Sequence, residues 1–318
     1  MLAVTALSVV FLRDLFAIVM LFGIYSLLSA GFFVTMDAVD VALTEAAVGA
    51  GVTTVLMLST LALTRRKEKA RLSPPSLLPL AVATITGLVL VYGTLDMPHL
   101  GDPDAPVHQH VAPRYIEQSG EEIGVPNIVT SVLASYRGFD TLGEVVVIFA
   151  AGLGVLALLG VAGGDRHRAR VSAMEHHLVL RVITKALAPL ILLYALYIQF
   201  HGDYGPGGGF QAGVVFAAAI ILFAIVFGLT KAEQVITPTF LRYMMGAGAL
   251  IYGATGVVTL VLGGNFLDYN TLAHDPLHGQ HYGILAVEFG VGVTVTAVMI
   301  SIFFNFFGRS SKPQEEEQ

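Results

Sequence analysis

The sequence predicts an all-α membrane protein with about eight spanning helices and a short apolar segment before them. Hydrophobic residues make up 55% of the 318 residues and charged residues only 13%, which is far from a soluble globular composition. Several windows of about 20 residues are apolar almost throughout, the length that an α-helix needs to cross a bilayer. These runs are continuous and do not alternate, which excludes a transmembrane β-barrel.

The spans can be assigned in chain order. Residues 2–12 are apolar but too short to cross the bilayer unless the helix is tilted or shielded. Full-length spans are predicted over 15–34, 38–63, 77–95, 141–162, 177–200, 209–229, 239–262 and 281–307. We expect an acidic loop over 96–122, a short surface helix over 123–136, and a loop at Asp275-Pro276.

Basic residues set the expected orientation of the spans. One cluster, Arg65 to Arg71, follows the second span, and a second cluster, Arg166 to Arg170, follows the fourth. Lys and Arg are enriched on the cytoplasmic side of membrane proteins, so loops 64–76 and 163–176 and the C-terminus are predicted to be cytoplasmic. The span count places both loops on one side, as this rule requires.

Composition also bounds the organisation and the function class. The two basic loops divide the chain into modules 1–76, 77–170 and 171–309, followed by a polar tail, 310–318, that we expect to be disordered. The chain has no cysteine, which excludes disulfides and thiolate chemistry. We see no nucleophile–base pair and no cofactor loop, and the histidines are expected to be solvated loop residues. The sequence thus predicts no enzyme, no cofactor, no metal site and no nucleic-acid partner.

Acidic residues inside the second span are the strongest functional signal. In DAVDVALTEAAVGAGVTT, Asp40 lies near the start and Glu45 about seven residues in, roughly 10 Å along the helix. A carboxyl group at that depth is costly and usually marks an ion or proton path. The small residues that follow Glu45 allow close helix packing, so the carboxyl is expected to face other helices. The alternative is a neutral, hydrogen-bonded acid that only holds helices together.

A second acidic pair opens the fourth span. Asp140 and Glu144 are one helical turn apart and could face one cavity. Thr141-x-x-Glu144 also has the spacing of a capping box, in which Glu144 would satisfy the first backbone N–H groups. Both interpretations stay open.

The segment HGDYGPGGGFQAG, from His201 to Gly213, lies between the fifth and sixth spans. Its glycines and its proline predict a tight turn. The turn could line a cavity and coordinate a cation, or it could be a packing corner, which the spacing favours. The candidate residues are His201, Asp203, Gly207, Gly208, Gly209 and Gln211.

Two more charged residues lie within spans. Glu288 sits about seven residues into the last span, next to two glycines, and resembles Glu45 in depth. Lys185 lies about eight residues into the fifth span. It could join a buried ion pair, but a long basic side chain can also reach the interface.

These stretches resemble the multi-subunit Mrp (Mnh) cation/proton antiporters of bacteria and archaea. DAVDVALTEAAVGAG resembles a module at the C-terminal end of the large A subunit that also occurs in membrane-bound hydrogenases, and NIVTSVLASYRGFDTLGEVVVIFAAGLGV resembles the next module. HGDYGPGGGFQAGVVFAAAI resembles the signature of the B subunit. Together they cover most of the chain, in the order of the C-terminal part of an A subunit joined to a B subunit.

The resemblance implies a function and partners. We expect a membrane subunit that supplies part of the route for proton-driven Na⁺ export, with Glu45 and Glu144 in the ion pathway. The large antiporter-like module that precedes the first stretch in the family is not in this sequence, so a large antiporter-like protein and several small membrane proteins are expected partners. The alternatives are a membrane-arm subunit of a hydrogenase-like redox complex and a structural subunit with inert carboxyls.

Overall fold

The computed structural model describes residues 1–68, 77–99, 101–159, 174 and 176–308, and this part of the chain is helical with no strand. Eight helices are long and apolar enough to span a membrane, and one short apolar helix precedes them, which confirms the predicted fold class. The spans are α2 (Leu15–Thr35), α3 to α4 (Val39–Leu61), α5 (Leu77–Thr94), α9 (Gly138–Leu159), α10 (Leu178–His201), α11 (Gly209–Phe227), α13 (Pro238–Val261) and α14 (Pro276–Phe307).

Shorter elements connect the spans or precede them. They are α1 (Leu2–Phe11), α6 (Pro106–Gln109), α7 (Ala112–Glu122), α8 (Ile128–Thr130), the π-helix η2 (Ser131–Tyr136), α12 (Leu229–Val235) and the 3₁₀ turn η3 (Tyr269–Leu272). The second span is itself composite, because α3 (Val39–Glu45) and α4 (Thr54–Leu61) flank a π-helix, η1 (Ala46–Thr53).

Helices α14 and α11 form the centre of the bundle. In their most apolar windows 72% and 61% of the residues are buried, against 17% or less in α2, α5, α9 and α10. Glycines allow this close approach. A Cβ at Gly213 of α11 would lie 2.8 Å from the carbonyl oxygen of Gly292, and one at Gly290 would lie 2.7 Å from the carbonyl oxygen of Gly248 on α13. Small residues at crossings are how membrane helices pack closely.

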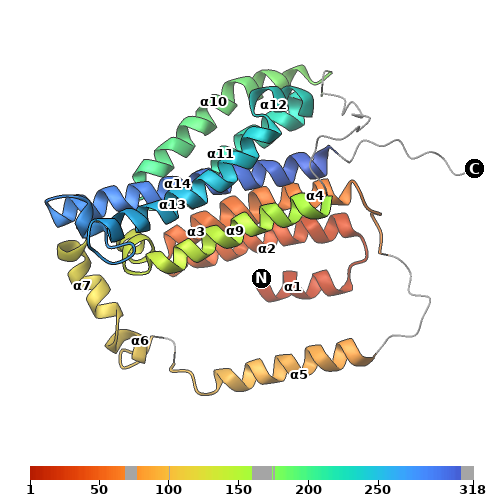
Figure 1. Cartoon of the computed structure of the whole chain (residues 1–318). Coiled ribbons are helices and arrows are strands. Elements are labelled where there is room, and N and C mark those ends of the chain that lie inside the picture. The colour runs from red at the N-terminus through yellow and green to blue at the C-terminus, as the bar shows by residue number, and fades with distance from the viewer. Residues whose placement is uncertain (69–76, 100, 160–173, 175, 309–318) are drawn as a thin grey trace, which may run out of the picture.

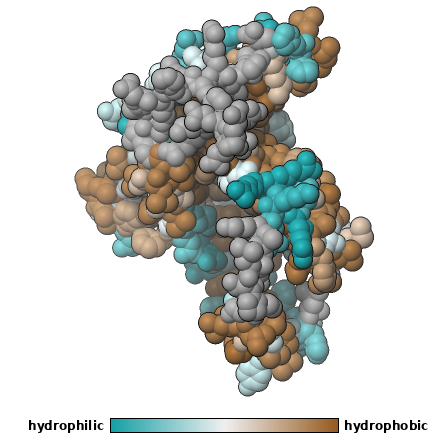
Figure 2. Space-filling model, turned by 90° about the vertical axis from the view of Figure 1, so that its right-hand side faces the viewer, coloured by the Kyte–Doolittle hydropathy of each residue, from teal (hydrophilic) through white to brown (hydrophobic). Residues whose placement is uncertain are grey.

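Helix α5 stands apart from the other spans (Figure 1). None of its described residues is buried, although its mean hydropathy of 1.9 equals that of α10. In Figure 2 its end is the brown cluster at the bottom of the molecule. Its apolar surface is therefore left for lipid or for other chains.

Parts of the chain differ from the sequence predictions. Helix α14 begins at Pro276, with Asp275 as its N-cap, so the predicted loop there is wrong and His278 lies on the helix. Proline is well suited to the first helical position, which explains the difference. The expected loop 96–122 contains the amphipathic helix α7.

The predicted surface helix over 123–136 is also different. It consists of α8 and η2, and Thr130, Ser131 and Ala134 within it are buried. The segment packs against the glycine-rich turn, where Thr130 Oγ1 donates to the carbonyl of Gly202. The predicted tail 310–318 and the basic residues from Lys69 to Arg71 and from Arg166 to Arg170 lie outside the described residues.

Candidate functional site

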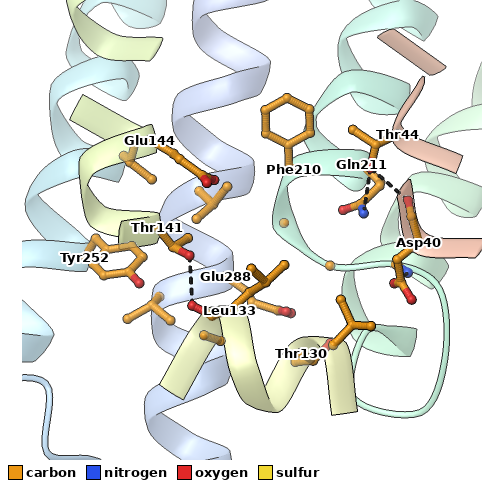
Figure 3. A pocket seen from close by; sticks show the side chains of 18 of the residues that line it. Asp40, Thr44, Thr130, Leu133, Thr141, Glu144, Phe210, Gln211, Tyr252 and Glu288 are labelled. Carbon is orange, nitrogen blue, oxygen red and sulfur yellow. Dashed lines mark hydrogen bonds between the residues drawn. The ribbon is translucent and has the colours of Figure 1, made fainter. Parts of the chain in front are cut away.

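Three acidic residues from three distant segments line one cavity of about 270 Å³. Asp40 comes from α3, Glu144 from α9 and Glu288 from α14. Glycines 207–209 and Gln211, from the glycine-rich turn and the start of α11, also line it. Figure 3 shows the side chains of Glu144 and Glu288 around this space, with Asp40 next to Gln211 and Thr44. The structure thus brings together residues from all three predicted modules.

Glu288 is the most deeply buried acid of the cavity. Its side chain is 9% exposed, and its Oε2 atom has no hydrogen-bond partner within the described part of the chain. It is close enough to Asp203 and Asp40 for their charges to act on it. A buried carboxylate without a partner is costly, which makes Glu288 unusual among the acids of this chain.

Asp40 and Gln211 connect the second span to the glycine-rich turn. The backbone N–H of Gly207 donates to Asp40 Oδ1 at 3.3 Å, and Gln211 Nε2 donates to Thr44 Oγ1 at 3.0 Å (Figure 3). Asp40 is half-buried and Gln211 is buried. Both side chains therefore have polar atoms at the cavity wall.

The glycine-rich turn both lines the cavity and packs against α14. Gly208 has φ +109°, a conformation that other residues rarely adopt, and its Cβ position would lie 3.0 Å from Glu288 Oε1. At Gly209 a Cβ would collide with the backbone carbonyl of Glu288. The two interpretations of this segment, cavity wall and packing corner, are thus compatible.

We expect Gly209→Ala to weaken the bundle, because the added methyl group meets backbone that cannot yield without separating α11 from α14. Overpacking of this kind costs about 1–3 kcal/mol or more. Thermal unfolding of the purified protein should show a lower midpoint. The matched control is Gly246→Ala, where a Cβ would meet nothing within 4 Å. Equal midpoints for the two variants would contradict the packing role.

Glu144 is one of the cavity-lining residues and is exposed in this chain. Helix α9 begins at Gly138, and Thr141 Oγ1 donates to the carbonyl of Leu133, so the predicted capping box is not formed. Asp140 is not part of the cavity wall. It is exposed and pairs with Arg137 at 2.6 Å.

Glu45 lies outside the cavity lining. It is half-buried and ends α3, immediately before the π-helix η1. A Cβ at Gly49, one turn on, would lie 2.8 Å from Glu45 Oε1 and would collide with Ser26 of α2. The carboxyl therefore sits near the contact between η1 and α2. π-Helical segments are frequent at functional sites, and this one has no signature in the sequence because its residues also suit an α-helix.

Two other sequence candidates lie away from the acids. Lys185 is exposed on α10, with its ammonium 5.9 Å from the ring centre of Phe227. His201 stacks on Tyr197, with ring centres 4.8 Å apart. The structure does not bring either residue to the cavity wall.

His281 is a residue that the sequence analysis missed. Its Nδ1 atom lies 2.8 Å from Asp203 Oδ2, and Asp203 is 4% exposed. Burial raises the pKa of Asp203 above its usual value, while His281 opposes the rise. The sequence signal that could have identified His281 is its seven-residue spacing from Glu288, which places both residues on one helix face.

The fold and the site define a polytopic membrane protein with ionisable groups gathered in its interior. Comparison with known protein families shows which proteins this chain is related to. A family model described as "Domain related to MnhB subunit of Na+/H+ antiporter" matches residues 179–301. Models for the D and E subunits of MBH match residues 1–66 and 79–175.

Two relatives match different shares of the chain. The chain is 33% identical over 141 residues to the putative antiporter subunit mnhB2 of Staphylococcus haemolyticus, covering 43% of this chain and 99% of that protein. It is 28% identical over 293 residues to a probable K⁺/H⁺ antiporter A/B subunit of Rhizobium meliloti, covering 82% of this chain. It spans 28% of the length of that longer relative.

Two solved structures are similar. A chain of the Mrp complex from Dietzia sp. DQ12-45-1b matches with a TM-score of 0.77 and 28% identity, over 98% of this chain and 35% of that one. A chain of the membrane-bound sulfane sulfur reductase, an archaeal respiratory membrane complex, matches with a TM-score of 0.57 and 32% identity, over 72% of this chain and 96% of that one. The chain belongs to the MnhB-related family of Mrp antiporter subunits, with the layout of an A–B fusion.

Proposed function

We propose that this chain is a membrane subunit of a multi-subunit monovalent cation/proton antiporter and supplies part of its ion pathway. The observation that carries the proposal is the convergence of Asp40, Glu144 and Glu288, from three distant segments, on one cavity. Carboxyl groups inside a membrane protein mark ion and proton routes. The antiporter subunits among the relatives support the same function.

The chemistry needed is an exchange at carboxyl groups. A carboxylate binds either a proton or a monovalent cation. When several carboxylates lie close together, their mutual repulsion favours the binding of a proton or a cation to one of them. Buried acids that open in turn to opposite sides would exchange protons for Na⁺, and Li⁺ or K⁺ could follow the same route. One charge that crosses 100 mV is worth about 2.3 kcal/mol, enough to shift a cation gradient more than tenfold. The protein then needs no cofactor beyond the transported ions.

The membrane placement follows from the same proposal. The host membrane is the cytoplasmic membrane of a prokaryotic cell, with the basic loops 64–76 and 163–176 and the C-terminus on the cytoplasmic side. The glycine-rich turn is then on the outer side. The divisions 1–76, 77–170 and 171–309 act as three modules of one polypeptide, the first two resembling the end of an A subunit and the third a B subunit.

The exposed apolar surface of helix α5 is a candidate interface with partner subunits. We propose that neighbouring membrane subunits, among them a large antiporter-like one, pack against its apolar surface. A photo-crosslinking residue at Leu88, which is 65% exposed, should form an adduct with another protein chain in native membranes. The control is the photo-crosslinking residue placed at position 298 instead, because Val298 is 1% exposed and should form no such adduct. Adducts with lipid alone at Leu88 would contradict this interface.

A second candidate function is that of a membrane-arm subunit in a redox-driven complex. The similarity to the sulfane sulfur reductase chain and to MBH subunits favours it. Purification of the chain from its native membrane in mild detergent separates the two functions. Co-purifying antiporter-like subunits without iron or nickel support the antiporter, and iron–sulfur or nickel–iron subunits would replace it with the redox complex.

A further inference from the structure

A histidine and an aspartate connect the end of the bundle with the buried acids. The His281 side chain is 43% exposed and the Asp203 side chain 4% exposed, and Nδ1 and Oδ2 are 2.8 Å apart. One member of the pair can therefore exchange protons with water, while the other lies inside the protein. Imidazole is the side chain best suited to exchange protons near neutral pH.

Asp203 is held at a fixed position by its backbone. Its carbonyl accepts from the N–H of Asn127 at 2.9 Å, and the Asn127 side chain donates to the carbonyls of Gly202 and Gly205. Thr130 Oγ1 also donates to the Gly202 carbonyl at 2.7 Å. The turn is thus fixed by the α8 segment. The second carboxyl oxygen of Asp203, Oδ1, has no hydrogen-bond partner in the described part of the chain.

Proton transfer between His281 and Glu288 needs an ionisable group between them, and Asp203 is that group. Those two residues are two turns apart on one face of α14, about 10 Å along the axis, which is too far for direct proton transfer. The charge of Asp203 acts on Glu288, and Cβ positions at Gly202 and Gly208 would lie 3.1 and 3.0 Å from the Glu288 carboxyl oxygens. The absence of side chains at these two glycines leaves Glu288 directly beneath the turn that carries Asp203.

Few other ionisable groups face this pair. Within the described residues, Asp40 accepts a hydrogen bond from Gly207 of the same turn, His201 lies two residues before Asp203, and Asp275 pairs with His278 at the surface at 3.3 Å. The ring of Tyr282 is 6.2 Å from that of His281. The pKa of Asp203 is raised by burial, which lets this carboxyl hold a proton at a pH where an exposed aspartate would be ionised.

We infer that His281 and Asp203 form a proton relay that connects the surface at this end of the bundle with Glu288 and the acid-lined cavity. The inference rests on the proposed transport function and names the residues through which the proton enters or leaves. His281 and Asp203 transfer the proton between the surface and the cavity.

The relay balances in protons. A water-derived proton binds the outer nitrogen of His281, and the imidazolium donates its Nδ1 proton to Asp203 Oδ2. Asp203, now neutral, passes that proton to the Glu288 carboxylate after its carboxyl group rotates, and becomes a carboxylate again. A ring flip of the neutral imidazole turns its remaining N–H toward Asp203 and readies the other nitrogen for the next proton. The reverse sequence releases a proton.

The test uses the full complex in membrane vesicles, with cation-dependent proton movement followed by a pH-sensitive dye. We expect His281→Ala to lower the initial rate at least about tenfold, somewhat less than the 10²–10⁴-fold that a lost proton-transfer group typically costs. Free imidazole in the buffer should enter the vacated, half-exposed position and restore most of the rate. A structural defect would not respond to imidazole. The matched control is His278→Ala, which removes a surface histidine one turn away and should keep the wild-type rate with or without imidazole.

Two results would overturn the relay. One is a wild-type rate in His281→Ala, or in His281→Gln if the alanine variant does not assemble, because glutamine keeps the contact but cannot titrate. The other is a low rate in an assembled His281→Ala complex that imidazole leaves unchanged. Wild-type exchange in Glu288→Gln would instead overturn the proposed transport function itself, so the two failures are distinguishable.

Discussion

Glu288→Gln is expected to abolish cation-dependent proton movement while the complex still assembles. Glutamine has nearly the same shape as glutamic acid, so the packing beneath Gly208 is retained. It can neither release a proton nor carry the charge that holds a cation, and no other acid of the cavity is as buried. Dye-loaded vesicles report the exchange after Na⁺ is added, and co-purification of the other subunits reports assembly.

The control for Glu288 is an acid that lies far from the cavity. Glu117→Gln changes the same side chain on the exposed surface of α7 and should leave the exchange rate unchanged. Proton movement at the wild-type rate in assembled Glu288→Gln complexes would show that this carboxyl is only a packing element.

Glu45→Gln is the second change from which we expect complete loss of antiport with the assembly intact. From the sequence motif and the family resemblance we expect this acid to be in the ion pathway, and its position at the junction of α3 and the π-helix η1 agrees with that expectation. Because Glu45 lies outside the cavity lining, we expect it to act at a separate position of the ion route, beside α2. The same vesicle assay measures it.

Glu68→Gln is the matched control for Glu45, since it removes an exposed carboxyl from the same module. Na⁺-dependent proton movement that persists in the Glu45 variant would refute its place in the pathway. A variant that fails to assemble would instead show that Glu45 holds α2 and α3 together, which is the structural alternative stated from the sequence.

The spans are predictable from sequence because length and hydropathy decide them. Their interior contacts are not, since nearly every face of such a helix is apolar and the hydrophobic pattern carries little information on rotation. Helix α14 illustrates both points. Residues 281–307 are evident from their hydropathy, whereas the first turn begins with a proline that also suits a loop. The π-helices escape prediction because they use the residue types of α-helices.

The acids are predictable one by one, but not their grouping. Asp40, Glu144 and Glu288 each stand out as a charge within a span, and only the fold shows that they share a cavity while Glu45 and Asp140 lie outside it. Asp203 is noticeable for its place in the glycine-rich turn. His281 is the first residue of the predicted last span and, like the other histidines, is expected to be solvated, so the sequence does not indicate its contact with Asp203.

The composition of the cavity wall has a consequence for biosynthesis. Its acids come from positions 40, 144 and 288, so a ribosome has made most of the chain before the last wall segment enters the bilayer. A nascent chain that stops after α9 carries Asp40 and Glu144 but has neither α11 nor α14 to place them around a common space. Incomplete translation products would thus lack the finished cavity.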